Sequence, residues 1–367
     1  MGKRRVAYLC NFQHLNPIYK ILLSMPISNG CQTMQRFCNL GWTDVSIGYV
    51  STVILLTHWK GRFGNRMFTY LYGVNYARRH STQFFLPSKW EGTTLFADCG
   101  IQVFPDESLC SQLIESGRNR TDPEVRHEAV RSYFESRGNP VSYHDPDKDE
   151  ENQSENVYFE KLCVQSERIF QRYSMREVRS IFEWSPAVKE SSLYQEMEAR
   201  KGTYSVAHLR RGDIANVSLN ERRDTAYSVL SRQSYERAFS DFGVSPDEVI
   251  WVTDDRTGNW GIPRNPVRHA GWSYPEGSTQ IEGCFFDWLE DFLLIYFAKS
   301  VFRANSSFSW WAACLNPDAR IYSPVLTERK NYLGPGDELD VEFVEGNHPH
   351  WLNLKRGRPT DNIYIPA

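Results

Sequence analysis

The stretch YSVAHLRRGD occupies residues 204–213. Its first half is mostly apolar, which predicts a buried strand over 204–208. Arg210 and Arg211 follow directly, whereas arginine in a soluble protein normally lies on a solvated surface. Ligands of α/β proteins bind at the carboxyl ends of strands, and a planar, forked guanidinium suits a diphosphate. The stretch alone favours equally a site for a phosphorylated ligand and a structural Arg–Asp pair on a loop.

The same order of strand, loop and helix recurs on both sides of this stretch. A β-branched apolar run at 50–57 predicts a buried strand, followed by a glycine loop at 61–67 and a helix at 68–79. Ser185-Pro186 is typical of a helix start. Beyond residue 202 the pattern predicts strands at 249–253, 301–304 and 319–323 and helices at 234–242, 285–298 and 309–315.

These elements predict an α/β fold with two Rossmann-like domains facing a crevice. We expect an unassigned N-terminal segment at 1–49, an acceptor-side domain at 50–200, a nucleotide-sugar domain at 201–330 and a C-terminal tail at 331–367.

Composition excludes several classes of protein. The chain has 367 residues, 41% of them hydrophobic, and a net charge of −3, so no basic field exists to hold nucleic acid. None of the eight cysteines forms a C-x-x-C pair, which favours buried free thiols over zinc, although one or two disulfides remain open in a secreted chain. No apolar run is long enough to predict a transmembrane span.

Three further motifs each allow two interpretations. The glycines in the loop at 61–65 suit either a close approach to a ligand or a tight turn. Asp254 and Asp255 follow a strand, where they could bind a nucleotide ribose or base, or cap a helix. The segment at 305–308 precedes a helix, where it could bind phosphate or serve only as a cap.

Two D-x-D patterns lie at 145–149, in an acidic, proline-containing segment. A metal site of this type needs a strand end to aim both carboxylates at one cation. We therefore expect a surface loop there and no metal.

Four segments in order are more specific than any single motif. They are GRFGNRMF at 61–68, HLRRGD at 208–213, VTDD with Trp260 at 252–260, and DFLLIYFAKSVFRANSSFSWWAACLN at 291–316. Together they resemble glycosyltransferase family 11, the α-1,2-fucosyltransferases, over roughly residues 50–325. The resemblance implies a GT-B-type fold, GDP-fucose as donor, and metal-independent transfer with inversion at the anomeric carbon.

The resemblance also implies site residues. Arg210 and Arg211 would be donor-site arginines, one of them clamping the diphosphate and stabilising the leaving GDP, and Asp213 would orient an arginine or act as a base. The remaining donor-binding residues would be Gly64, Asn65, His208, Asp254, Asp255, Ser306, Ser307 and Phe308. No cofactor is expected beyond GDP-fucose itself.

The chain departs from the family pattern in three places. Arg66 replaces the usual Gln, Ile214 replaces an aromatic residue, and residues 1–49 match nothing in the family. Arg66 leaves a different sugar nucleotide open as donor.

The expected activity is transfer of L-fucose to a galactose 2-hydroxyl of a glycan. The alternatives are transfer from another sugar nucleotide and non-catalytic glycan or nucleotide binding. We expect the acceptor loops at 88–160 and 214–232. With no visible anchor the expectation is a soluble cytoplasmic protein, with peripheral or Golgi membrane association if the chain is eukaryotic.

Overall fold

The computed structural model describes residues 52–97, 102–119, 121–146, 156–160, 174–211, 229–254, 279–325 and 338–347. All of them belong to one compact unit, Val50–Ala367. The domain boundaries at 200/201 and 330/331 stay predictions.

The first sheet is parallel throughout, with strand order β3-β2-β1-β5-β4. Its strands are β1 (Val53–Leu56), β2 (Gln83–Leu86), β3 (Gln102–Val103), β4 (Val141–Tyr143) and β5 (Asn156–Phe159). Alternate side chains of β1 face opposite sides, so Ile54 and Leu56 join one hydrophobic core and Leu55 joins another. Both faces of the sheet are therefore covered, as a parallel sheet requires.

The second sheet has strand order β14-β12-β11-β6-β8, and only the edge strand β14 is antiparallel. Its strands are β6 (Ser205–Leu209), β8 (Val249–Thr253), β11 (Ser300–Phe302), β12 (Arg320–Val325) and β14 (Glu342–Glu345). Two small pairs accompany it, β7 (Val229–Leu230) with β13 (Glu338–Leu339) and β9 (Gln280–Ile281) with β10 (Cys284–Phe285). The segment expected as a tail thus supplies β13 and β14.

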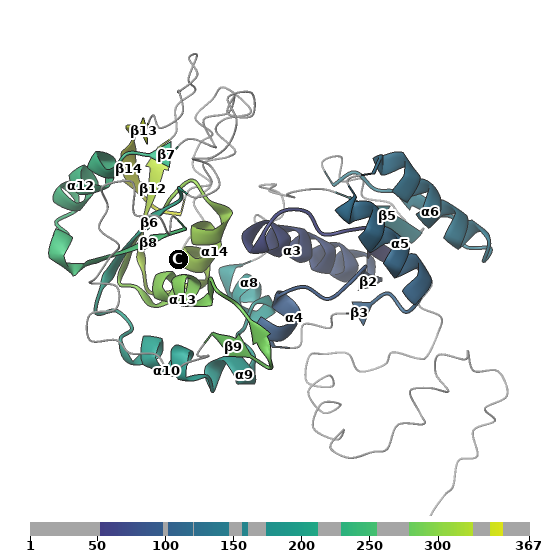
Figure 1. Ribbon diagram of the computed structural model, residues 1–367, viewed down its shortest axis with the longest axis horizontal. Coiled ribbons are helices and arrows are strands. Elements are labelled where there is room, and N and C mark those ends of the chain that lie inside the picture. The colour runs from purple at the N-terminus through teal and green to yellow at the C-terminus, as the bar shows by residue number, and fades with distance from the viewer. Residues whose placement is uncertain are drawn as a thin grey trace, which may run out of the picture. The chain divides into compact units, whose positions relative to one another are not determined.

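Helices cover the two sheets (Figure 1). They are α3 (Phe63–His80), α4 (Gly92–Leu95), α5 (Glu107–Arg118), α6 (Pro123–Glu135), α8 (Met175–Ile181), α9 (Pro186–Lys189), α10 (Ser192–Ala199), α12 (Arg232–Asp241), α13 (Leu289–Phe297) and α14 (Ser307–Leu315), with a 3-10 turn at Pro246–Glu248. The predicted α/β class with parallel sheets is confirmed.

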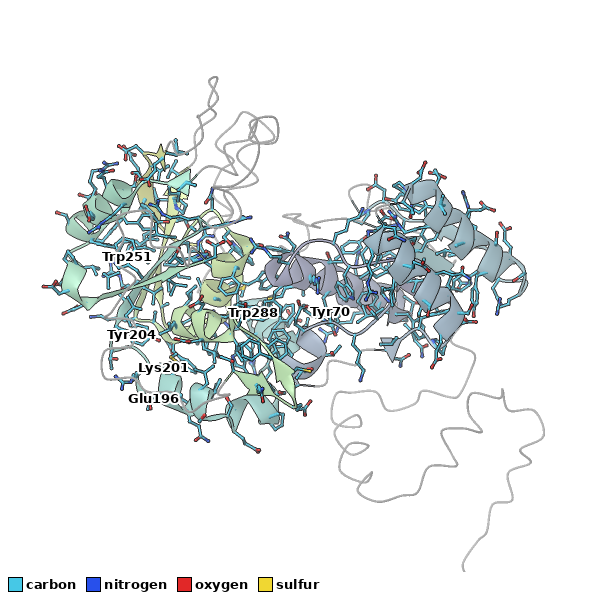
Figure 2. The ribbon with its side chains drawn as sticks, viewed as in Figure 1. Tyr70, Glu196, Lys201, Tyr204, Trp251 and Trp288 are labelled. Carbon is cyan, nitrogen blue, oxygen red and sulfur yellow. The ribbon has the colours of Figure 1, made fainter. Side chains whose placement is uncertain are left out.

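A chain of aromatic rings joins α3 to α13. The Phe63 ring lies 4.2 Å from Trp288 and 5.8 Å from Trp90, and Trp90 lies 5.3 Å from Tyr70. Figure 2 labels Trp288 and Tyr70, the first and last rings of this aromatic series. Because one hydrophobic core includes residues of α3, α13 and α14, the first turn of α3 has a fixed position against the second sheet's helices.

Several expectations need correction. The helix predicted at 68–79 begins at Phe63, because Arg62 is already its extended N-cap. Phe285 lies in β10 and is exposed, rather than on the buried face of α13. The described part of the predicted acceptor loop at 88–160 is largely regular and includes α5 and α6.

The described cysteines are also only partly as expected. Cys110, Cys284 and Cys314 are free thiols. The first and last are buried, but Cys284 is exposed. Among the described helices, none is both long and apolar enough to cross a membrane.

Candidate functional site

The site predicted from sequence begins where three strands of the second sheet end. In the parallel register, His208 pairs with Val252 and Leu209 with Thr253, so Arg210 and Asp254 follow at the same edge. β11 lies on the other side of β6, and Arg303 and the segment leading into α14 follow it. The backbone pairing therefore brings residues from three distant segments together.

His208 is the buried centre of this edge. Burial lowers the pKa of the His208 imidazole to about 4; the charge of Asp254 opposes this, and Arg210, Arg62 and Arg303 reinforce it. The imidazole is consequently neutral at pH 7. Its surroundings contain three guanidinium groups and one carboxylate, which is a charge balance suited to an anionic ligand.

Arg210 and Arg211 have different surroundings, because successive side chains of an extended segment point to opposite sides. Arg210 is half-buried, and its Nη1 donates to the backbone oxygen of Asn305 at 3.5 Å. Arg211 is 1% exposed and its Nη1 lies 2.6 Å from Oε1 of Glu338. Arg210 thus lies beside the start of α14, whereas Arg211 ties the loop to β13.

Asp254 holds the end of β6 in place. Its Oδ1 accepts a hydrogen bond from the backbone nitrogen of Arg211 at 2.7 Å. Asp213 and Asp255, the other two carboxylates predicted for the site, lie outside the described residues, as does Ile214.

The segment at 305–308 forms the start of α14. Ser306 is the N-cap, and its hydroxyl accepts from the backbone nitrogen of Phe308 at 3.3 Å. The hydroxyl of Ser307 donates to Oδ1 of Asn65 at 2.9 Å. The Phe308 ring lies 5.8 Å from His208. A helix start beside several arginines is a favourable position for phosphate oxygens.

Gly64 and Asn65 lie in the first turn of α3 and not in a loop before it. A Cβ built on Gly64 would lie 2.7 Å from the backbone carbon of Ser307 and 2.8 Å from the nitrogen of Phe308. Glycine at position 64 therefore permits α3 and α14 to meet end to end. This contact joins the first and last of the four motifs across 242 residues.

Two arginines of the site were not assigned from the sequence. Arg62 is the exposed N-cap of α3, and its charge acts on His208 from the first half of the chain. Arg303 is fully buried, and its Nη2 donates to Oγ of Ser323 at 2.6 Å. Burial lowers the pKa of the Arg303 guanidinium to about 9, so it remains charged at pH 7. The rule that identified Arg210, a cation after a buried strand, also applies to Arg303.

The departure at Arg66 has a local explanation. Its Nη1 donates to both carboxylate oxygens of Glu91, at 2.9 and 2.8 Å, and its Nε donates to the backbone oxygen of Gly61 at 3.0 Å. Arg66 therefore links α3 to the residue preceding α4.

Within the described ranges, no group of three or more His, Cys, Asp or Glu side chains could hold a metal ion. Of the two D-x-D patterns at 145–149, only Asp145 is described.

Comparisons with known proteins give matches to solved structures alone. No family model matches the chain, and no curated protein sequence does. NodZ α-1,6-fucosyltransferase soaked with GDP-fucose is similar over 80% of this chain and 99% of its own, at 15% identity and a TM-score of 0.42. A NodZ structure from Bradyrhizobium covers the same shares at 16% identity, also with a TM-score of 0.42. POFUT1 in complex with GDP-fucose is similar over 76% of this chain and 98% of its own, at 12% identity and a TM-score of 0.42.

Proposed function

We propose that this protein transfers L-fucose from GDP-fucose to a galactose 2-hydroxyl of a glycan, with inversion and without a metal ion. The observation that carries the proposal is the contact of Gly64 and Asn65 with Ser307. Those residues belong to separate motifs of the resemblance to family 11, and they meet beside His208 and Arg210. A shared donor site explains why motifs so distant in sequence contact one another.

The charges of the site suit the departure of GDP. Breaking the bond between fucose and phosphate develops positive charge on the sugar and negative charge on the diphosphate. Arg62, Arg210 and Arg303 act on one small region, and the N-terminus of α14 adds backbone N–H groups. Fixed positive groups stabilise the leaving diphosphate in the place of a cation.

The proposal gives the two adjacent arginines different roles. Arg210 contacts the diphosphate, because it is half-buried beside Asn305 at the start of α14. Arg211 positions the loop, because it is buried against Glu338 while its backbone nitrogen binds Asp254. Residues 201–330 bind the donor together with the start of α3, and the rest of 50–200 binds the acceptor.

Calorimetric titration tests the donor. Purified protein is titrated with GDP and GDP-fucose in EDTA, beside GDP-mannose and UDP-galactose. We expect binding of GDP and GDP-fucose that does not change with EDTA. Binding of only the uracil nucleotide, or of none of the four, would overturn the proposal, and preference for GDP-mannose would favour the other-donor alternative.

A transfer assay then separates catalysis from simple binding. The protein is incubated with GDP-fucose and a galactose-terminated oligosaccharide, and the linkage of the product is read by NMR. An α-1,2-linked fucose on galactose is the expected product. GDP-fucose binding without transfer to any glycan in a broad acceptor set would instead indicate a binding protein.

A further inference from the structure

A group of charged side chains surrounds Glu160 at the carboxyl edge of the first sheet. Arg126 of α6 donates to both carboxylate oxygens, from Nη2 to Oε1 at 2.5 Å and from Nε to Oε2 at 3.0 Å. Lys60 Nζ lies 2.6 Å from Oε1. Two imidazoles reach Oε2, His58 through Nδ1 at 3.6 Å and His127 through Nε2 at 3.5 Å. These five residues are called the Glu160 cluster below.

Strand pairing explains how Glu160 reaches His58. Leu56 of β1 pairs with Phe159 of β5, and the backbone nitrogen of Thr57 donates to the oxygen of Phe159 at 3.1 Å. His58, which follows Thr57, and Glu160, which follows Phe159, therefore lie close together. The hydroxyl of Thr57 lies 3.3 Å from Nδ1 of His58. The same nitrogen faces the carboxylate of Glu160.

The cluster keeps the carboxylate charged and the imidazole neutral. Burial alone would raise the pKa of Glu160, but hydrogen bonds from Arg126 and Lys60 lower it to about 2. Burial lowers the pKa of His58 to about 4; Glu160 opposes this shift, while Arg126, Lys60 and His127 reinforce it. Gly117 of α5 packs against the ring and adds no charge. At pH 7 His58 is therefore a neutral imidazole beside a fixed carboxylate.

The proposed transfer needs a group that accepts the proton of the acceptor hydroxyl. Asp254 already holds the backbone nitrogen of Arg211 through Oδ1 at 2.7 Å, and Asp213, the base suggested by the family resemblance, lies outside the described residues. A neutral imidazole can take that proton. The Glu160 carboxylate lies 3.6 Å from Nδ1 and offsets part of the positive charge that the ring then gains, against the combined effect of burial, Arg126, Lys60 and His127.

We propose that His58 is the general base of the transfer and that Glu160 is its positioning residue, an inference that rests on the proposed fucosyl transfer. The acceptor hydroxyl gives its proton to Nε2 of His58, and its oxygen forms the new bond to C1 of fucose. The bond from C1 to the diphosphate oxygen breaks, and its electron pair leaves with GDP. Water takes the proton from His58 after the product departs.

The position of His58 along the chain fits this role. The connection from β1 to α3 carries His58, and the first turn of α3, six residues later, carries Gly64 and Asn65, which contact Ser307 at the candidate donor site. Trp59 anchors this connection to the residues after β2, because its Nε1 donates to the backbone oxygen of Ser88 at 3.1 Å. One short, anchored segment thus carries the proposed base and the donor-contacting residues.

The test compares His58→Ala with His144→Ala, using the full-length protein. Both imidazoles are buried and follow a strand of the first sheet, but His144 contacts the Tyr72 hydroxyl and lies outside the Glu160 cluster. We expect His58→Ala to lower kcat about 100-fold or more while the Kd for GDP changes by less than about twofold. Added imidazole should restore part of the turnover, and His144→Ala should retain wild-type kcat.

The pH dependence provides a second readout. Wild-type kcat/KM should be level near pH 7 and fall as the pH approaches about 4, where His58 becomes protonated. Glu160→Gln should lower kcat less than His58→Ala does, and it should shift the pH at which kcat/KM begins to fall. Glu160→Asp should recover part of the kcat that Glu160→Gln loses.

The outcomes separate the two proposals. If the wild-type enzyme transfers fucose and His58→Ala retains kcat within about threefold, the assignment of the base is wrong and the fucosyl transfer stands. A parallel loss of GDP affinity, melting temperature and kcat in His58→Ala, without imidazole rescue, would show that the cluster is structural. A wild-type protein that neither binds GDP-fucose nor transfers fucose would overturn both proposals.

Discussion

At the scale of single residues, neighbouring side chains of one type have different surroundings. Arg210 and Arg211 are adjacent in sequence, but one is half-buried beside α14 and the other is buried against Glu338. The alternation of side chains along an extended backbone explains the difference. Under the proposed function, ligand binding belongs to Arg210, and the ion pair with Glu338 gives Arg211 a structural role.

Replacing Arg210 tests the ligand-binding role. Arg210→Lys keeps the charge but loses the planar fork, so we expect GDP to bind about 10- to 100-fold more weakly in calorimetry. The melting temperature should change little. Arg232→Lys is the matched control, because Arg232 forms a surface ion pair with Glu236 on α12. Equal GDP affinity in the two variants would remove Arg210 from the proposed donor site.

Replacing Arg211 tests the structural role. Arg211→Ala removes a buried side chain and its ion pair, but the Glu338 side chain is 27% exposed to solvent, so the free energy of unfolding should fall by about 1–3 kcal/mol. Urea denaturation measures the change, and Glu338→Ala should be destabilised in the same direction. An Arg211→Ala protein as stable as the wild type would contradict this role.

At the scale of elements, the meeting of α3 and α14 forms the core of the candidate site. Helix starts carry unpaired backbone N–H groups, and here Ser306 and Asn65 place side-chain oxygens among them. The close approach depends on the absence of a side chain at Gly64. The geometry of the site is therefore sensitive to small changes at this junction.

Gly64→Ala should push the two helix starts apart. We expect a loss of about 1–3 kcal/mol in stability, together with weaker GDP binding. Gly73→Ala is the control, because it overpacks the same helix against the ring of Phe84 in the core. That variant should be destabilised but should bind GDP normally. If both variants lose GDP affinity to the same degree, the effect is global and not local to the junction.

At the scale of the whole molecule, buried titratable groups connect stability to pH. Burial lowers the pKa values of His58 and His208 to about 4 in the folded protein, against 6.5 for the free side chain. The unfolded chain therefore binds more protons between these pH values, and protonation favours unfolding. A shift of this size corresponds to about 3 kcal/mol for each histidine.

Urea unfolding at several pH values measures this effect. Stability should fall as the pH drops from about 6.5 to 4, and the fall should be smaller in His208→Gln. Below about pH 4.5, protonation of Glu160, whose pKa is lowered to about 2, should remove further stability. A wild-type protein of constant stability between pH 6.5 and 4.5 would contradict the burial of both neutral histidines.

Prediction from sequence succeeded where the signal is local. The apolar run at 249–253 is β8 with the predicted bounds. Prediction from sequence failed for helices whose side chains are mostly exposed. The helices α5 and α6 have few buried residues among many charged ones, so the sequence predicts loops over 88–160.

The sequence by itself determined the α/β class and the strand ends that carry His208, Arg210 and Asp254, because short apolar runs followed by polar residues are patterns of neighbours along the chain. Only the tertiary structure decided that Asn65 meets Ser307 and that Glu160 meets His58. Each of these contacts joins residues more than a hundred positions apart, and each results from strand register and helix packing, which no local pattern encodes.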